Sequence, residues 1–158
     1  RCMPNTPALV GAGMTGLYAN EQVKPEHREA AERVLEAAGA VVWVPSEGLL
    51  DAVTAVSGSG PAYFFLLMEY MAKTGTALGL DADTSRMLTL QTALGAALMA
   101  QKSTEPLANL RQNVTSPGGT TEAAINTMLA HGMPEAIESA LQAAQQRSIQ
   151  LAKEFGNP

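Results

Sequence analysis

The spacing of hydrophobic and polar residues divides the chain into two regions of different texture. In residues 1–45, short apolar runs predict strands at 9–10, 14–18 and 41–44. Between the last two, residues 25–38 predict a helix, because a proline opens the segment and an apolar stripe follows it. A strand–helix–strand order with short links is typical of the tail of an α/β sheet.

From residue 46 onward the pattern predicts helices alone. They are expected over 46–56, 61–78, 84–102, 105–112, 118–131 and 134–155. Ser46 and Asp83 are expected to cap two of these helices, and Gly39 to close the helix before them. The glycine-rich stretch from Ser57 to Pro61 predicts a turn. The fold class is therefore mainly α, with a small α/β segment in front.

Two of the predicted helices are unusually apolar. The helix at 61–78 carries only the pair Glu69 and Lys73, and the helix at 84–102 is uncharged from 87 to 101. A helix that is apolar around most of its circumference must be buried on several sides. We therefore expect an obligate homodimer through these two helices. The alternative is that an N-terminal part absent from the chain covers them.

Composition narrows the function class. The 158 residues are 46% hydrophobic and carry 10 positive and 15 negative side chains, a net charge of −5. This balance argues against a nucleic-acid binder, which needs a basic face. The uncharged stretch 87–101 is shorter than the ~20 apolar residues of a membrane span. A lone cysteine, Cys2, predicts a buried apolar thiol in a reducing, cytoplasmic setting. The start without Met, inside an ordered segment, predicts a fragment.

The strongest candidate for chemistry is the segment from Asn113 to Glu122, which joins two predicted helices. Pro117 ends the first, and Gly118-Gly119 supply unusual backbone angles. The backbone amides that follow lie in the first turn of the next helix, where they favour a carboxylate or phosphate. Hydroxyls in the segment can donate or accept. The alternative is an ordinary helix–helix turn with a capping residue.

Two further segments are weaker by themselves. The stretch from Ser57 to Pro61 lacks the Lys of a phosphate-binding loop and the preceding strand of a dinucleotide fingerprint, so it can be only a tight turn. In Met3–Pro7, Asn5 stands between two prolines and can donate and accept, as a nucleotide ligand requires, or can bond its own backbone. No triad or metal-ligand spacing is present, so cofactor-driven hydride transfer fits better than hydrolysis.

Together, residues 1–7, 51–63 and 110–121 closely resemble pyrroline-5-carboxylate reductase. The resemblance implies NADPH- or NADH-dependent reduction of 1-pyrroline-5-carboxylate to L-proline. It also implies that residues 1–45 are the C-terminal remnant of a Rossmann-type α/β domain. Residues 46–158 would form an all-helical substrate-binding and dimerisation domain, and some family members assemble five dimers into a decamer.

The resemblance also implies site residues. Thr121 would be catalytic, hydrogen-bonding the imine nitrogen. The substrate-binding set would be Asn113, Val114, Ser116, Gly118, Gly119, Thr120 and Thr121, and the cofactor-binding set Met3, Asn5 and Pro61. No metal is expected, and the chain alone is expected to be inactive. Two alternatives stay open: a non-catalytic helical oligomerisation fragment, and a related imine or oxo-acid reductase.

Overall fold

The computed structural model describes residues 1–156, which fall into two compact units. The first comprises residues 1–64 together with the residues from 137 onward, and the second residues 65–136. The expected fold class is confirmed: the chain is mainly helical, with one small sheet near its N-terminus. The domain boundary predicted between residues 45 and 46 stays a prediction.

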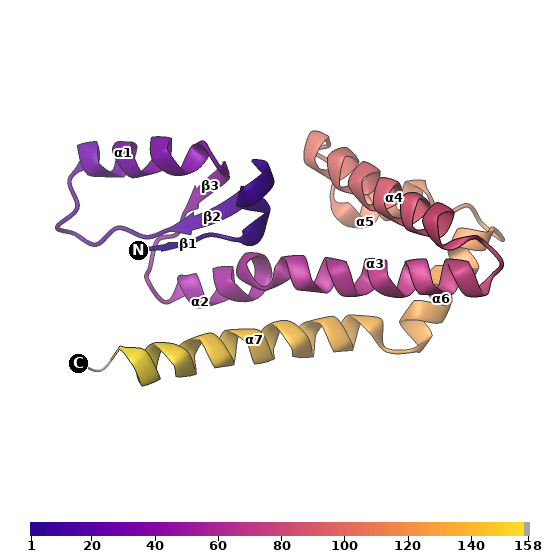
Figure 1. The fold of residues 1–158 in the computed structure, drawn as a ribbon. Coiled ribbons are helices and arrows are strands. Elements are labelled where there is room, and N and C mark those ends of the chain that lie inside the picture. Colours follow the sequence, from indigo (N-terminus) through magenta and orange to yellow (C-terminus); the bar gives the residue numbers. More distant parts are fainter. Residues whose placement is uncertain (157–158) are drawn as a thin grey trace. The chain divides into compact units, whose positions relative to one another are not determined.

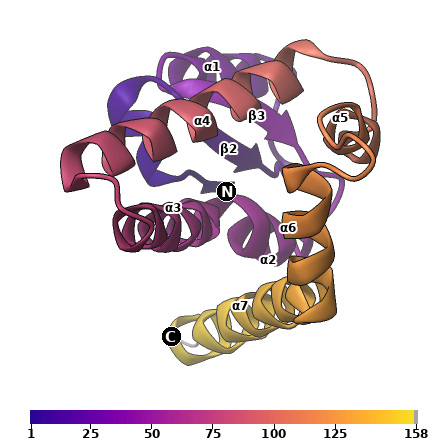
Figure 2. The ribbon, with the colours of Figure 1, turned by 90° about the vertical axis from the view of Figure 1, so that its right-hand side faces the viewer.

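The first unit is built around a three-stranded sheet of order β1-β2-β3. The strands are β1 (Cys2–Met3), β2 (Gly13–Leu17) and β3 (Gly39–Trp43). β1 pairs antiparallel with β2, and β2 pairs parallel with β3. The helix α1 (Pro25–Glu36) covers one face of the sheet, and α2 (Leu49–Val53) lies on the other (Figures 1 and 2).

Elements of the first unit pack closely against each other at two glycines. A Cβ on Gly16 of β2 would lie 2.6 Å from Cγ1 of Val53 in α2, so only glycine allows the helix to rest on the strand. A buried apolar core forms at the same place, from Leu17, Leu50 and Ala55. Gly39 has a φ of +146°, and a Cβ there would collide with the backbone of β2.

Three expectations for the first region are wrong. Residues 9–10 belong to a 3₁₀ helix, Thr6–Val10, because the amides of Ala8 and Gly11 donate to carbonyls three residues back. Gly39 does not close the preceding helix, since α1 ends at Glu36 and Gly39 begins β3. The thiol of Cys2 is exposed rather than buried, because β1 lies at an edge of the sheet.

The predicted turn at 57–61 is instead mostly helical, with a bend at Ser59 between two helical segments. α2 is followed by a π-helical segment, Thr54–Gly58, and then by α3 (Gly60–Ala77). The amide of Ser59 donates to the carbonyl of Thr54, five residues back, over 2.8 Å. Ser46 does not cap α2; it only accepts a backbone bond in the turn before the helix.

The long helix α7 (Met133–Phe155) returns to the first unit, where Ser148 Oγ donates to Asp51 Oδ1 of α2 over 2.6 Å. Within residues 1–156, no helix has both the length and the apolar character needed to cross a bilayer.

The second unit is helical. It contains most of α3 together with α4 (Ala82–Lys102), α5 (Leu107–Asn113) and α6 (Thr120–Ala130). Asp81, not Asp83, caps α4, because its carboxylate accepts the amide of Thr84 over 2.9 Å. α3 and α4 cross closely at Gly75, where any side chain would collide with Ser85.

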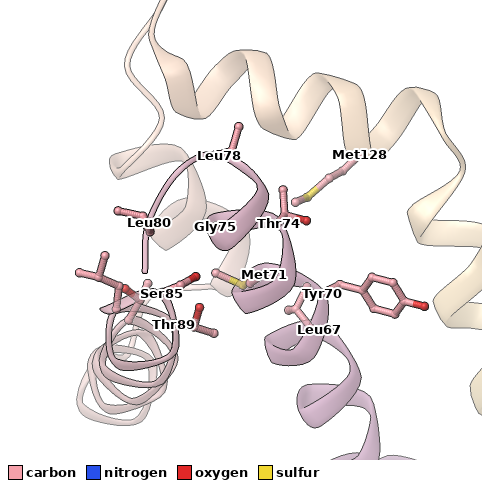
Figure 3. Close-up of a pocket in the computed structure, with 12 residues that line it drawn as sticks. Leu67, Tyr70, Met71, Thr74, Gly75, Leu78, Leu80, Ser85, Thr89 and Met128 are labelled. Atoms are coloured by element: carbon pink, nitrogen blue, oxygen red, sulfur yellow. The ribbon is translucent and has the colours of Figure 1, made fainter. Parts of the chain in front are cut away.

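This second unit has no apolar core of its own. Among its described residues the buried ones are Ser85 and Thr89, and Ser85 Oγ donates to the carbonyl of Ala72 over 2.7 Å. A cavity of about 460 Å³ lies between α3, α4 and α6. Figure 3 shows residues that line it, mainly apolar side chains such as Met71 and Met128. Large apolar residues are exposed on α3 and α4: Phe65, Leu66, Leu67, Tyr70, Met71, Met87, Leu88, Leu90, Leu94, Leu98 and Met99.

Candidate functional site

The predicted substrate segment is an exposed link between α5 and α6. Asn113 is the last residue of α5, and Gly119 precedes the first turn of α6 in an extended conformation. Gly118 has a φ of +72°, a backbone conformation that favours glycine. Pro117 and Gly118 together therefore turn the chain so that α6 starts directly after the link.

The amides of this link are not equally available to a ligand. The amide of Gly119 donates to the carbonyl of Ser116 over 3.0 Å, and the amide of Gly118 donates to Oε2 of Glu122 over 2.8 Å. In the part of the chain that the structure describes, the amides of Thr120 and Thr121 have no acceptor. At the electropositive N-terminus of α6, the amides that remain free to bind an anion are therefore these two adjacent ones.

Side chains around these donors are partly fixed. Asn113 donates through Nδ2 to Oε2 of Glu105 over 3.2 Å, which orients its amide group. The hydroxyls of Ser116, Thr120 and Thr121 make no hydrogen bond within residues 1–156, and these three residues are exposed. The link can therefore hold a carboxylate on amides and present hydroxyls to a neighbouring polar atom.

The residues predicted to approach the cofactor gather in the first unit, around the π-helical segment. Asn5 donates through Nδ2 to the carbonyl and the hydroxyl of Ser57, over 3.1 and 3.3 Å. Its Oδ1 accepts the amide of Met14 over 2.9 Å. The Sδ of Met3 lies 3.6 Å from the position of a Cβ on Gly58. Pro61 follows in the first turn of α3.

Met3 and Asn5 thus both contact the π-helical segment. The predicted substrate-binding residues, from Asn113 to Thr121, lie together in the link between α5 and α6. The two groups belong to different compact units. Within residues 1–156, no group of three His, Cys, Asp or Glu side chains could hold a metal ion. The arrangement suits binding and orientation more than nucleophilic or metal chemistry.

The expectations from the sequence did not include the hydrogen bonds that two residues near these groups make. Glu122 occupies the third position of α6 and reaches back to the amide of Gly118. This spacing of an acidic residue after a helix start is a capping signal that the sequence did contain. Tyr63 donates through its hydroxyl to the carbonyl of Ala55 over 3.1 Å, which no sequence spacing indicated.

Comparisons with known proteins give one consistent result. Residues 47–151 match the family described as pyrroline-5-carboxylate reductase dimerisation. The chain is 56% identical to a pyrroline-5-carboxylate reductase of Pseudomonas aeruginosa over 99% of its length, and 46% identical to one of Pasteurella multocida over 98%. Each alignment covers 57% of the relative, so the chain spans little more than half the length of these curated relatives.

Solved structures agree with this result. A pyrroline-5-carboxylate reductase of Coxiella burnetii superposes with a TM-score of 0.92 at 48% identity, covering 96% of this chain and 56% of that one. A pyrroline carboxylate reductase of Plasmodium falciparum with NADP bound superposes with a TM-score of 0.87 at 33% identity, covering 93% of this chain and 60% of that one.

Proposed function

The chain belongs to the pyrroline-5-carboxylate reductase family, and we propose on that premise that it serves NAD(P)H-dependent reduction of 1-pyrroline-5-carboxylate to L-proline. It would contribute the substrate-binding link and the dimer interface of the enzyme. The observation that carries this proposal is the N-terminus of α6. There, two adjacent backbone amides, those of Thr120 and Thr121, have no acceptor within residues 1–156 and stand beside exposed hydroxyls.

The proposed site binds the substrate at two points. The carboxylate accepts from the amides of Thr120 and Thr121 and from the hydroxyl of Ser116, where the helix dipole favours negative charge. The Thr121 hydroxyl, the proposed catalytic group, hydrogen-bonds the ring nitrogen. Asn113, held by Glu105, and the exposed Val114 border the ring. Gly118 and Gly119 shape the link through backbone alone.

The reduction itself needs little from the chain. NADPH or NADH, when bound, would supply the hydride chemistry that turns the protonated imine of the substrate into the amine of proline. The protein's part is to hold the ring so that the imine carbon faces the hydride donor. Met3, Asn5 and Pro61 are the proposed residues on the cofactor side.

The proposed active form is a homodimer built through α3 and α4. These helices expose a large apolar surface and, with α6, line an open cavity of about 460 Å³, and a second copy of the chain would cover both. Assembly of dimers into a decamer is a further part of the proposal. We place the enzyme in the cytoplasm, in keeping with the free, exposed thiol of Cys2.

The test is pyrroline-5-carboxylate-dependent NADPH oxidation by the full-length reductase that carries this chain. Thr121→Ala should lower kcat by roughly 10- to 100-fold without changing the melting temperature, because the variant removes one hydrogen bond to the reacting ring. Thr127→Ala is the matched control, since its hydroxyl bonds only the carbonyl of Ala123 in the same helix. Equal turnover in both variants would remove Thr121 from the site.

The same assay separates the alternatives. Residues 1–158 alone should oxidise no NADPH, and turnover by them would contradict the need for a further part of the protein. A full-length protein that dimerises but never turns over would be an oligomerisation module. Preference for another cyclic imine or an oxo acid in a substrate screen would indicate a related reductase.

A further inference from the structure

We propose that Asn5 is a positioning residue, which acts on the reaction by fixing the π-helical segment Thr54–Gly58 and the start of α3. It would not act as a direct ligand of the nucleotide. This inference rests on the proposed function, because it concerns the residues assigned to the cofactor side. It is carried by the hydrogen bonds of one part-buried side chain.

The starting point is a carbonyl that the helix leaves without its usual donor. In an α-helix the carbonyl of Ser57 would accept the amide of residue 61, but residue 61 is proline and has no N–H. In a π-helix it would accept the amide of Ala62, but that amide donates to Ser59 over 3.0 Å. The Nδ2 of Asn5 donates to this carbonyl over 3.1 Å. A part-buried acceptor is thereby satisfied from outside the helix.

The other end of the Asn5 side chain holds the sheet. Oδ1 accepts the amide of Met14 at 2.9 Å, and Met14 lies in β2. Ser57 closes the cluster, since its hydroxyl donates to the carbonyl of Met14 over 3.5 Å. One amide side chain therefore ties a strand to the helical segment immediately before Pro61.

Only an amide of this length suits both ends. Aspartate at this position would still accept from Met14, but it would place a carboxylate oxygen against the carbonyl of Ser57. The consequence for the reaction follows from position: Pro61 stands four residues after Ser57, so a shift of the segment moves the proposed nicotinamide contact. A displacement of about 1 Å at a reacting centre can cost about 100-fold in rate.

Asn5→Asp in the full-length reductase is the decisive variant. We expect kcat to fall at least ~10-fold while the dissociation constant for NADPH, measured by fluorescence titration, changes less than ~3-fold. Tyr63→Phe is the matched control, because it also removes one side-chain bond to a carbonyl of this segment, that of Ala55, but leaves Ser57 untouched. Its kcat should stay within ~3-fold of the parent.

A second variant tests whether the bond from Asn5 to the Ser57 carbonyl replaces the helical donor that Pro61 lacks. Pro61→Ala restores an N–H that can reach the Ser57 carbonyl, so Asn5→Asp should shift the denaturation midpoint less in the Pro61→Ala background than in the parent. Additive shifts would overturn the inference. So would an unchanged kcat in Asn5→Asp, or an NADPH affinity loss as large as the kcat loss, which would indicate direct binding.

The outcomes also separate this inference from the function it rests on. A parent enzyme without pyrroline-5-carboxylate-dependent turnover would remove the proposed function, and the coupling between positions 5 and 61 would still be measured by denaturation. If Pro61→Ala does not fold, the kinetic comparison of Asn5→Asp with Tyr63→Phe decides alone.

Discussion

The two compact units of this chain are stabilised in opposite ways. The first buries Leu17, Leu50 and Ala55 and ties its elements with side-chain bonds that span up to 97 residues of sequence. The second buries only Ser85 and Thr89 among its described residues and leaves apolar side chains of α3 and α4 exposed. The first unit buries apolar side chains within the chain itself. The second unit leaves an apolar surface exposed, which another apolar surface could bury.

This difference separates the residues of the proposed function into those held in place by the chain itself and those in the unit with the exposed apolar surface. The cofactor-side residues lie where the chain itself fixes their position, as the bonds of Asn5 show. The proposed substrate link lies in the second unit, whose exposed apolar surface the proposed partner would cover. Variants in the first unit should therefore change the stability of the chain, whereas variants on the exposed surface of the second unit should change dimer dissociation.

The largest effect is expected from Leu94→Glu on α4. Leu94 is 53% exposed, and a carboxylate there would have to be desolvated against the partner's apolar surface. The dimer dissociation constant should rise at least ~100-fold. Light scattering of the full-length reductase over a dilution series measures this directly.

Val34→Glu on α1 is the control for that experiment, because it also replaces an apolar side chain by glutamate, at a 71% exposed residue outside the proposed interface. The control should leave the oligomer intact. If Leu94→Glu stays dimeric at the concentrations where the parent does, α4 is not in the interface.

A smaller but still large effect is expected inside the first unit from Gly39→Ala. The added Cβ would collide with the backbone of Gly13, and the φ of +146° is strained for any side chain. The cost should be about 2–4 kcal/mol of unfolding free energy, measured by denaturant titration. Gly48→Ala, with open space around it and a φ of −61°, should change it by less than ~0.5 kcal/mol. Equal effects at the two glycines would contradict the close packing of β2 and β3.

The elements that could be predicted are those marked by local signals. Pro25 marks the start of α1 and Pro134 lies in the first turn of α7, and Gly132, with a φ of +74°, follows α6 as expected. One segment that could not be predicted is bonded to a residue far away in the sequence. The π-helical segment accepts a hydrogen bond from Asn5, which lies 52 residues before Ser57 in the sequence. A pattern read over neighbouring residues does not contain such a bond.

The candidate site shows the same limit. The link from Asn113 to Thr121 was identifiable from its glycines and hydroxyls, but not the fact that Glu122 already holds one of its amides. The bonds of Glu122 and Glu105 depend on side-chain directions that become fixed only when α5 and α6 have formed. These bonds leave fewer free amides at the proposed anion site than the sequence suggests.

Glu122→Gln tests how the Glu122 carboxylate affects the proposed anion site, and the expected effect is modest. Glutamine can still accept from the amide of Gly118, so the link should keep its shape, while a negative charge beside the proposed carboxylate site is removed. The KM for pyrroline-5-carboxylate should fall by roughly 2- to 5-fold with kcat unchanged. Glu122→Asp, which keeps the charge, should not lower KM. A KM that rises in Glu122→Gln would show that the carboxylate helps to bind the substrate.

The smallest effect is expected at Asp81, which caps α4 in the second unit. Hydrogen bonds from the Thr84 side chain and then from its amide lower the pKa of the Asp81 carboxyl below its usual range. A folded pKa below the unfolded one contributes stability above the unfolded pKa, about 4. That contribution is lost as the pH falls through the folded pKa.

The melting temperature of Asp81→Asn should therefore lie slightly below that of the parent at neutral pH, and the difference should shrink once the pH falls below about 4. Asp83→Asn is the matched control, two residues further on in the first turn of α4 and without a capping bond. Its melting temperature should differ less from the parent. A pH-independent difference in Asp81→Asn would show that the cap acts by its shape alone. Because Asp81 is exposed and acts within the chain, this variant should leave the dimer intact, in contrast to Leu94→Glu.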